Sequence, residues 1–246
     1  MTVCVGIHCP DGVVIAADTQ VTYVGSHKGY APKIDYFGND TFCVGGAGSG
    51  YFDVLNETFL YLKENLVDLR ASSNRQVRDA IKRVLSSVVR KRPQEADSQF
   101  LLAAIAVRGK LSLTHFRRDI ASELPMAVIG CGNTHLSEYL QSWVSKQPED
   151  CSEGLHWATY ITYKAKQFVD GCGGKTDAMV VGLDGKVDVK RRSLTRHYEN
   201  YFAELEDEVF DLFGSMAIGR LTGSELGMSL KALTGRLERL HQPRDR

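Results

Sequence analysis

Apolar and small residues alternate from the second position of the chain onward, although most domains begin with loose, polar residues. Residues 2–8 and 13–21 both show the period of two that is typical of strands. The segment 10–12 between them reads Pro-Asp-Gly, which favours a turn. We therefore expect a β-hairpin that fixes the N-terminus inside a sheet.

The register of this hairpin decides which side chains share a face. A three-residue loop with glycine in the left-handed conformation would place Cys9 opposite Val13, and therefore Cys4 opposite Asp18. Odd-numbered residues then form an apolar core face, and even-numbered residues form a second face that is small and polar. Thr2 and Asp18 lie on the second face as diagonal neighbours, roughly 7–8 Å apart between their backbones.

The remaining pattern predicts pairs of helices between groups of strands. A period near that of a helix marks residues 51–66, and a second amphipathic helix begins at Ser73, where Ser73 and Gln76 form a capping box. Further strands are expected at residues 33–37, 41–46, 99–107, 110–116, about 126–131, 176–183 and 186–190, and further helices at 134–145 and 153–169.

This order favours a layered α+β fold with antiparallel sheets over alternating βαβ units. After about residue 192 the pattern changes to two amphipathic helices, Tyr198–Phe213 and Glu225–Leu240, and the first of them is rich in acidic residues. We assign residues 1–191 to one domain and residues 192–246 to a C-terminal helical extension.

Composition narrows the classes of function. The 30 basic and 30 acidic residues balance, which argues against nucleic acid or an anionic membrane as the main partner. No apolar run approaches the roughly 20 residues that a membrane span needs, and the first residues do not resemble a signal peptide. The six cysteines are scattered without metal-binding spacing, so we expect reduced thiols in a cytoplasmic protein without a metal site or a cofactor.

The first hairpin offers a reactive group. Methionine aminopeptidase normally removes an initiator methionine that precedes a small residue, and this removal would make Thr2 the N-terminal residue. The Thr2 hydroxyl is then a nucleophile, and its own α-amino group, with an ordinary pKa of about 7.7–8.0, is a base close to neutral pH. An ammonium from Lys33 nearby would lower the pKa of both groups, and Asp18 would hold that ammonium in place.

A threonine at the second position carries little information alone, but the segments around it form a set. They read TVCVGI, DGVVIAADTQVT, PKI, VGGAGSG, VIGCG and VDGCGGKTDAMVV. This set spans about residues 2–190 and resembles the proteasome β-subunit family and its bacterial relative, the proteolytic subunit of the two-component ATP-dependent protease. The resemblance implies the fold of N-terminal nucleophile hydrolases, a four-layer αββα sandwich of two antiparallel sheets flanked by helices.

The resemblance also implies roles, residue by residue. Thr2 matches the N-terminal threonine nucleophile of the family, and Asp18 matches its invariant acid. Lys33 matches the family's lysine if the loop before it is one residue shorter than usual. Gly48 matches the glycine whose N–H forms the oxyanion hole, where a donor aimed at developing charge contributes most to the rate.

The sequence departs from the family at several positions. Serine is usual where this chain has Cys131, and again where it has Cys172. The acid three residues before that second serine would fall on Val169, with Asp170 one position away. These groups tune the protonation of the threonine amine, so the departures concern the rate more than the type of reaction. Gln20 replaces a common arginine.

On the family pattern, four residues should surround the substrate side chain that precedes the cut: Val21, Ala31, Gly46 and Gly50. Two are glycine, one is alanine and none is charged, so the pocket should be roomy and apolar. Burial of a large apolar side chain gains roughly 1.5–3 kcal/mol, which favours cleavage after Leu, Tyr or Phe over cleavage after Asp or Lys. Gln20 lies beside this predicted pocket.

The resemblance therefore implies a threonine peptidase that works in a self-compartmentalised, homo-oligomeric ring on peptides or unfolded proteins, with an ATP-dependent unfoldase as a candidate partner. Two alternatives stay open. One is a small-molecule amidase of the same fold that acts without a closed ring. The other is a catalytically inactive scaffold subunit whose C-terminal helices bind partners.

Overall fold

The computed structural model describes residues 2–22, 27–93, 100–118, 120–130, 147–217 and 223–241. The chain forms two compact units, Met1–Glu199 and Asn200–Arg246. All of the described strands belong to the first unit, and so does the site described below.

The first unit contains two five-stranded sheets and a two-stranded ribbon, and every strand pair in them is antiparallel. The first sheet has the order β10 (Met126–Gly130), β1 (Val3–Cys9), β2 (Gly12–Asp18), β11 (Thr176–Gly182) and β12 (Val187–Lys190). The second sheet has the order β5 (Ile34–Asn39), β6 (Phe42–Ser49), β7 (Phe100–Val107), β8 (Lys110–Arg117) and β9 (Ile120–Glu123), and the ribbon joins β3 (Gln20–Thr22) to β4 (Lys28–Tyr30).

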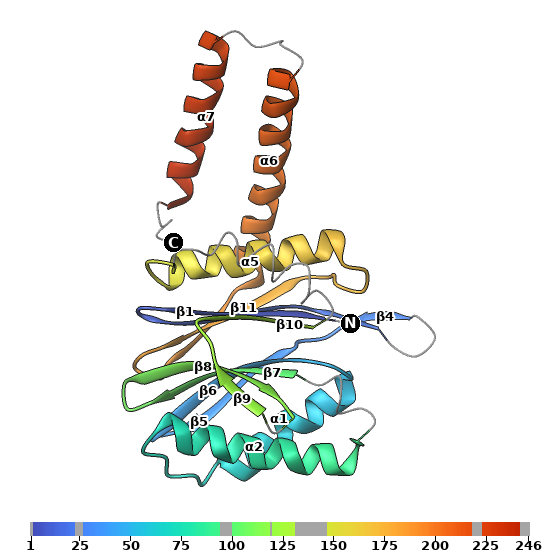
Figure 1. Cartoon of the computed structure of the whole chain (residues 1–246), viewed down its shortest axis with the longest axis vertical. Helices are drawn as coiled ribbons and strands as arrows, with labels where there is room; N and C mark the ends of the chain where they lie inside the picture. Colours follow the sequence, from blue (N-terminus) through green and yellow to red (C-terminus); the bar gives the residue numbers. More distant parts are fainter. Residues whose placement is uncertain are drawn as a thin grey trace. The chain divides into compact units, whose positions relative to one another are not determined.

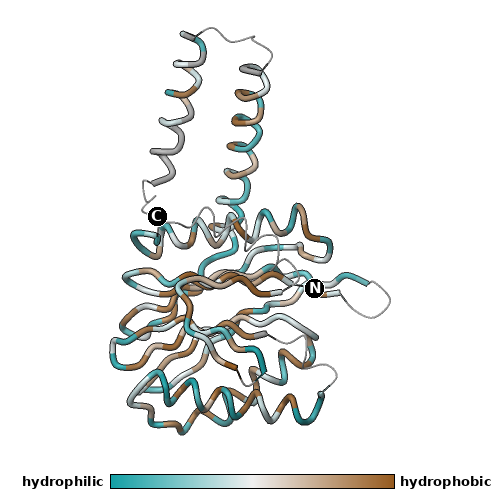
Figure 2. Tube along the Cα trace, in the orientation of Figure 1, coloured by the Kyte–Doolittle hydropathy of each residue, from teal (hydrophilic) through white to brown (hydrophobic). Residues whose placement is uncertain are grey.

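Helices cover the outer faces of both sheets, which gives the unit four layers (Figure 1). Helices α1 (Phe52–Leu66) and α2 (Asn74–Lys91) pack on the second sheet, and α5 (Cys151–Phe168) packs on the first. One apolar cluster fills each of the three spaces between layers, and Figure 2 shows the strands as the most hydrophobic part of the chain. The expected layered α+β fold with antiparallel sheets is confirmed.

The predicted register of the first hairpin is wrong by one residue. Cys9 pairs with Gly12 rather than with Val13, because the loop has two residues, Pro10 and Asp11, instead of three. The fixed φ of proline suits the first central position of a common tight turn. Gly12 does not have a positive φ. Glycine is needed here because there is no room for a side chain: a Cβ would lie 2.6 Å from the Cys151 Sγ atom.

The corrected register changes the faces of β1 and β2. Cys4 pairs with Ala17 and faces the second sheet, whereas Val3 and Val5 face α5, so both faces are buried and neither is a polar surface. Thr2 therefore does not share a face with Asp18 as a diagonal neighbour. A period of two makes any one-residue shift exchange the faces in this way.

The two helices of the α1–α2 layer form where the pattern predicts them. The Ser73 side chain caps α2 by accepting the backbone N–H of Gln76, whereas the Gln76 amide oxygen accepts the N–H of Ser72 rather than that of Ser73. Tyr51, where the predicted helix 51–66 begins, is instead the N-cap residue of α1 and is 55% exposed. The predicted strand 13–21 is divided after Asp18 into β2 and β3, the short strands β4 and β9 were not predicted, and the expected helix at 134–145 lies outside the described residues.

The C-terminal helices are longer than the pattern predicts: α6 spans Arg192–Ala217 and α7 spans Gly223–His241. The first two turns of α6 belong to the first unit, where Leu194 and Tyr198 pack against the apolar cluster beneath α5. No helix in the described part of the chain is long and apolar enough to cross a membrane.

Candidate active site

A buried ion pair lies at the open end of the β1–β2 hairpin. Asp18 is the last residue of β2, and its Oδ1 atom accepts a hydrogen bond of 2.8 Å from the Nζ atom of Lys33, which precedes β5. The side chains of Lys33 and Asp18 are 2% and 0% exposed. Such a pair must recover a large cost of desolvation, which it does only when the remaining polar atoms are also bonded.

The Asp18 carboxylate meets that condition with three backbone donors. Its Oδ1 atom also accepts the N–H of Val3 at 2.9 Å, and its Oδ2 atom accepts the N–H of Gly173 at 3.0 Å and that of Gln20 at 3.2 Å. A carboxylate offers about four acceptor positions, so the lysine and the three N–H groups fill them. This arrangement stabilises the ionised carboxylate inside the fold.

Thr2 is buried beside this group and is held from two sides. The next residue, Val3, is bonded through its N–H to the same Asp18 oxygen that holds Lys33, so the ammonium lies within two hydrogen bonds of the backbone nitrogen that follows Thr2. On the other side, a Cβ at Gly130 would lie 1.8 Å from the Thr2 carbonyl oxygen. The glycine at the end of β10 is therefore required for the chain to pass.

Gly48 lies near the end of β6, directly beside Lys33. Its N–H donates to the Lys33 carbonyl oxygen at 3.2 Å, and its carbonyl oxygen accepts the Cys4 thiol at 3.3 Å. A Cβ here would lie 2.0 Å from the Leu55 Cδ1 atom, so helix α1 requires glycine at this position. The structure thus brings the expected oxyanion donor next to Lys33, but its N–H is directed at a backbone carbonyl.

The predicted pocket residues lie on β3, β6 and the segments next to them. Val21 is buried in the ribbon, and the N–H of Ala31 donates to the Thr19 carbonyl at 2.8 Å. The open side of Gly46 faces α1, where a Cβ would lie 3.2 Å from the Phe59 ring. Gly50 has a φ of +140°, which an L side chain rarely adopts.

Gln20 adds an unusual polar group at this place. Its side chain is buried, and its Nε2 atom has no hydrogen-bond partner among the residues that the structure describes. An amide N–H2 left without a partner in a buried position is costly, so the group is a candidate for contact with a bound molecule.

Of the remaining predicted residues, Asp170 has no bond to this group. Asp170 is exposed at the end of α5 and makes no hydrogen bond or ion pair with any other described residue. Cys172 is buried, and its N–H donates to the Val169 carbonyl at 3.1 Å. Cys131 lies outside the described residues.

Sequence reasoning missed the role of Gly173, whose N–H binds the Asp18 carboxylate. The sequence did contain a signal, because two adjacent glycines follow Cys172. The structure explains the first of them, since a Cβ at Gly173 would lie 2.4 Å from the Gln20 Oε1 atom. It missed as well that the Val3 N–H ties the N-terminal strand to Asp18.

Comparisons with known proteins agree with this geometry. A family model described as proteasome subunit matches residues 2–181. A mutant of Anbu from Hyphomicrobium sp. strain MC1 has a TM-score of 0.74 at 13% identity, covering 86% of this chain and 97% of that one. Anbu, an ancestral beta-subunit, from Yersinia bercovieri has a TM-score of 0.72 at 14% identity, covering 85% and 96%.

A third solved structure is described as the helical assembly of the Anbu complex from Pseudomonas aeruginosa. Its TM-score is 0.67 at 14% identity, and the match covers 90% of this chain and 97% of that one. A comparison of the sequence with curated proteins finds no match. The structural likeness establishes the four-layer fold of N-terminal nucleophile hydrolases, and the family model covers well over half of the sequence. The chain therefore belongs to the proteasome subunit family.

Proposed function

We propose that the chain is a threonine peptidase whose nucleophile is Thr2 after removal of Met1. The observation that carries this proposal is the buried Lys33–Asp18 ion pair, which is bonded to the backbone directly after Thr2. A fully buried charged pair has a high cost of desolvation, so its presence near the chain terminus favours a functional role over a purely stabilising one. An N-terminal nucleophile needs a cation at this place.

The reaction follows from the groups around Thr2. Its hydroxyl attacks the carbonyl carbon of a peptide bond, and its own α-amine accepts the hydroxyl proton. The proton then passes to the leaving amine, and an acyl ester remains on Thr2. Water, activated by the same amine, hydrolyses the ester. Lys33 keeps the local potential positive, which favours the neutral, basic form of the amine.

The oxyanion that forms during attack is bound by the Gly48 N–H. In the present geometry this N–H donates to the Lys33 carbonyl, at a distance near the long end for such bonds. It must turn toward the substrate as the tetrahedral intermediate forms. A donor that is aimed only in the reacting complex still contributes, although less than one that is already in place.

The assembly we propose is a homo-oligomer that encloses the sites, as in a ring. Closed symmetry lets one gene product enclose sites that would otherwise cut any unfolded chain. The relative from Pseudomonas aeruginosa, which is described as a helical assembly, supports association of copies. The substrates are peptides or unfolded proteins, with preference for cleavage after large apolar residues.

A second candidate, an inactive scaffold subunit, is favoured by two observations. The Gly48 N–H is occupied by the Lys33 carbonyl, and Asp170 is exposed and has no hydrogen bond or ion pair with Asp18. A subunit with an unformed oxyanion hole and without the accessory acid could serve assembly alone.

Mass spectrometry of the intact protein after treatment with a peptide epoxyketone separates these candidates. We expect loss of Met1 and addition of one reagent molecule at Thr2, together with hydrolysis of fluorogenic peptides that end in Leu, Tyr or Phe. Thr2→Ala should abolish both labelling and hydrolysis while the native mass of the assembly stays the same. If Met1 is removed but Thr2 is not labelled, the scaffold reading stands; if Thr2→Ala retains parental turnover, Thr2 is not the nucleophile.

A further inference from the structure

A lysine at the end of α5 reaches into the loop that holds Asp18. The Nζ atom of Lys166 donates to the Gly174 carbonyl oxygen and to the Thr176 Oγ1 atom, each at 3.1 Å, and it forms an ion pair with Glu199. An ammonium has three donors, and all three are used here. The side chains of Lys166 and Glu199 are only 11% and 16% exposed.

This loop, residues 173–175, lies directly against Asp18 and its neighbours. The Gly173 N–H binds the Asp18 Oδ2 atom at 3.0 Å. The Lys175 N–H donates to the Thr19 Oγ1 atom at 2.9 Å, and the Lys175 carbonyl accepts the Thr19 N–H at 3.0 Å. The Gly174 carbonyl belongs to the same peptide as the Lys175 N–H, so a residue that fixes this carbonyl also fixes the contact with Thr19, two peptide units from the donor on Asp18.

The start of α6 holds the end of the same loop. Glu199 accepts a hydrogen bond from the Thr176 hydroxyl as well as from Lys166, and the Thr195 hydroxyl donates to the Thr176 carbonyl at 2.8 Å. One residue further along β11, Asp177 forms two hydrogen bonds with the Arg192 guanidinium, which raises the pKa of Arg192. These contacts all lie within the first unit.

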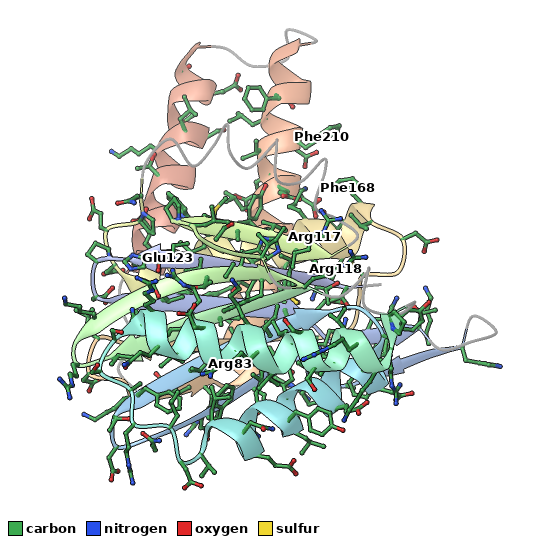
Figure 3. The ribbon with its side chains drawn as sticks, turned by 60° about the horizontal axis from the view of Figure 1, so that its bottom comes forward. Arg83, Arg117, Arg118, Glu123, Phe168 and Phe210 are labelled. Atoms are coloured by element: carbon green, nitrogen blue, oxygen red, sulfur yellow. The ribbon has the colours of Figure 1, made fainter. Side chains whose placement is uncertain are left out.

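A simpler explanation is that Lys166 merely stabilises α5, since a cation in the last turn of a helix interacts favourably with its dipole. That explanation leaves the polar contacts of Lys166 unexplained, and they differ from those of Lys164 on the same helix. The Lys164 ammonium lies over the ring of Phe168, which is 73% exposed at the end of α5 (Figure 3). Lys166 instead spends every donor on the loop and on the residue that anchors it.

We propose that Lys166 and Glu199 are positioning residues that hold the 173–175 loop so that the Gly173 N–H stays on the Asp18 carboxylate. The proposal rests on the proposed role of Thr2 for its effect on the rate. Without the lysine the Gly174 carbonyl and the Thr176 hydroxyl each lose a hydrogen bond, the Gly173 N–H moves from Asp18, and the carboxylate that orients Lys33 is displaced. Displacement of about 1 Å at a catalytic group can cost roughly 100-fold in rate.

The test compares Lys166→Met, which shortens the side chain by one atom and removes its donors, with Lys164→Met as the matched control. Hydrogen exchange of the full-length protein measures the loop directly. We expect exchange in residues 170–176 to rise at least about tenfold in Lys166→Met, and to stay at the parental rate in Lys164→Met.

The second readout is the rate at which the epoxyketone labels Thr2, together with kcat and KM for a fluorogenic peptide. In Lys166→Met we expect labelling and kcat to fall about 10- to 100-fold while KM changes less than about twofold, because Lys166 bonds to none of the predicted pocket residues. Lys166→Arg, which keeps donors, should recover most of the rate. Glu199→Gln, which keeps an acceptor, should lose less than Lys166→Met.

The outcomes separate this proposal from the proposed function. Parental exchange at 170–176 in Lys166→Met overturns the positioning role whether or not Thr2 reacts. Faster exchange with undiminished labelling overturns its link to the rate. If Thr2 of the parent protein is never labelled, the peptidase proposal fails, while exchange still decides whether Lys166 holds the loop.

Discussion

The two ends of the β1–β2 hairpin are held by opposite means. At the open end, Asp18 and Lys33 are buried charges, and the hydrogen bonds of Asp18 fill its carboxylate. At the turn end, small residues pack closely against helix α5: a Cβ at Gly12 would lie 2.6 Å from the Cys151 Sγ atom. A Cβ at Gly154 would lie equally close to the Cys9 Sγ atom.

The difference teaches where chemistry can be placed in this fold. The turn end has little room for added volume, and its carboxylate, Asp11, is exposed and accepts the Cys151 N–H at 2.8 Å, whereas the open end keeps charge inside at the cost of many aligned donors. A buried ion pair is replaceable by apolar residues when stability alone matters. Among the described residues, the pair therefore supports our proposal that the open end is the functional one.

The largest expected effect comes from removing the cation at the open end. Lys33→Ala should lower kcat at least about 1,000-fold and destabilise the protein by about 3 kcal/mol, because Asp18 stays buried without its counter-ion. Denaturant unfolding and peptide hydrolysis measure the two effects.

Lys63→Ala is the matched control, since Lys63 pairs with Asp35 at 2.7 Å but the two side chains are 42% and 32% exposed. This control should lose less than about 1 kcal/mol and keep full activity. Equal losses in the two variants would show that burial does not distinguish the Asp18 pair.

A smaller effect is expected at the turn end. Gly12→Ala should destabilise the protein by about 1–3 kcal/mol, because the new methyl group meets the Cys151 Sγ atom and the Val181 carbonyl oxygen. Activity per folded molecule should stay within about twofold of the parent. Adding Cys151→Ala to Gly12→Ala should recover part of the stability; a neutral Gly12→Ala would mean that the turn end is not limited by shape.

The smallest effect concerns the thiol at the turn end. A hydrogen bond with Cys9, together with burial and the nearby Asp11, raises the pKa of the Cys151 thiol far above its ordinary value. Burial raises the pKa of Cys43 to about 11. The thiolate is the reactive form, so a raised pKa lowers the reaction rate at every pH below it.

Iodoacetamide labelling followed by mass spectrometry therefore should modify Cys43 slowly at pH 8 and about tenfold faster for each pH unit above it, up to about pH 11. Cys151 should remain unmodified over the same range. Rapid labelling of Cys151 at pH 8 would contradict the view that the turn end is chemically inert.

Residue type predicted the open end better than it predicted the turn end. A threonine, an aspartate and a lysine are informative because few structural roles require them together, and the structure brings Asp18, Lys33 and Gly48 to one place. The hairpin register was wrong because Pro-Asp-Gly fits both a two- and a three-residue loop. Only the packing of Gly12 against α5 selects between them.

The contacts of Lys166 could not be predicted for a different reason. Lysine and glutamate are common on helices, and the pairing of Lys166 with Glu199 joins residues 33 positions apart on separate helices. The basic residues of α2, such as Arg83 (labelled in Figure 3), are also cations on an amphipathic helix, and the sequence does not distinguish them from Lys166. In the structure they line an open groove. Burial, which separates these cases, is a property of the fold alone.

Gly130 also limits how this protein can evolve. Its φ of +105° and the 1.8 Å that would separate a Cβ from the Thr2 carbonyl oxygen leave no conservative replacement, since every other amino acid adds that atom. A lysine or an acidic residue can be replaced by a residue of similar size or charge, but a glycine has no such conservative substitute. The strand that follows the proposed nucleophile, Thr2, is thus held by a position where no substitution fits.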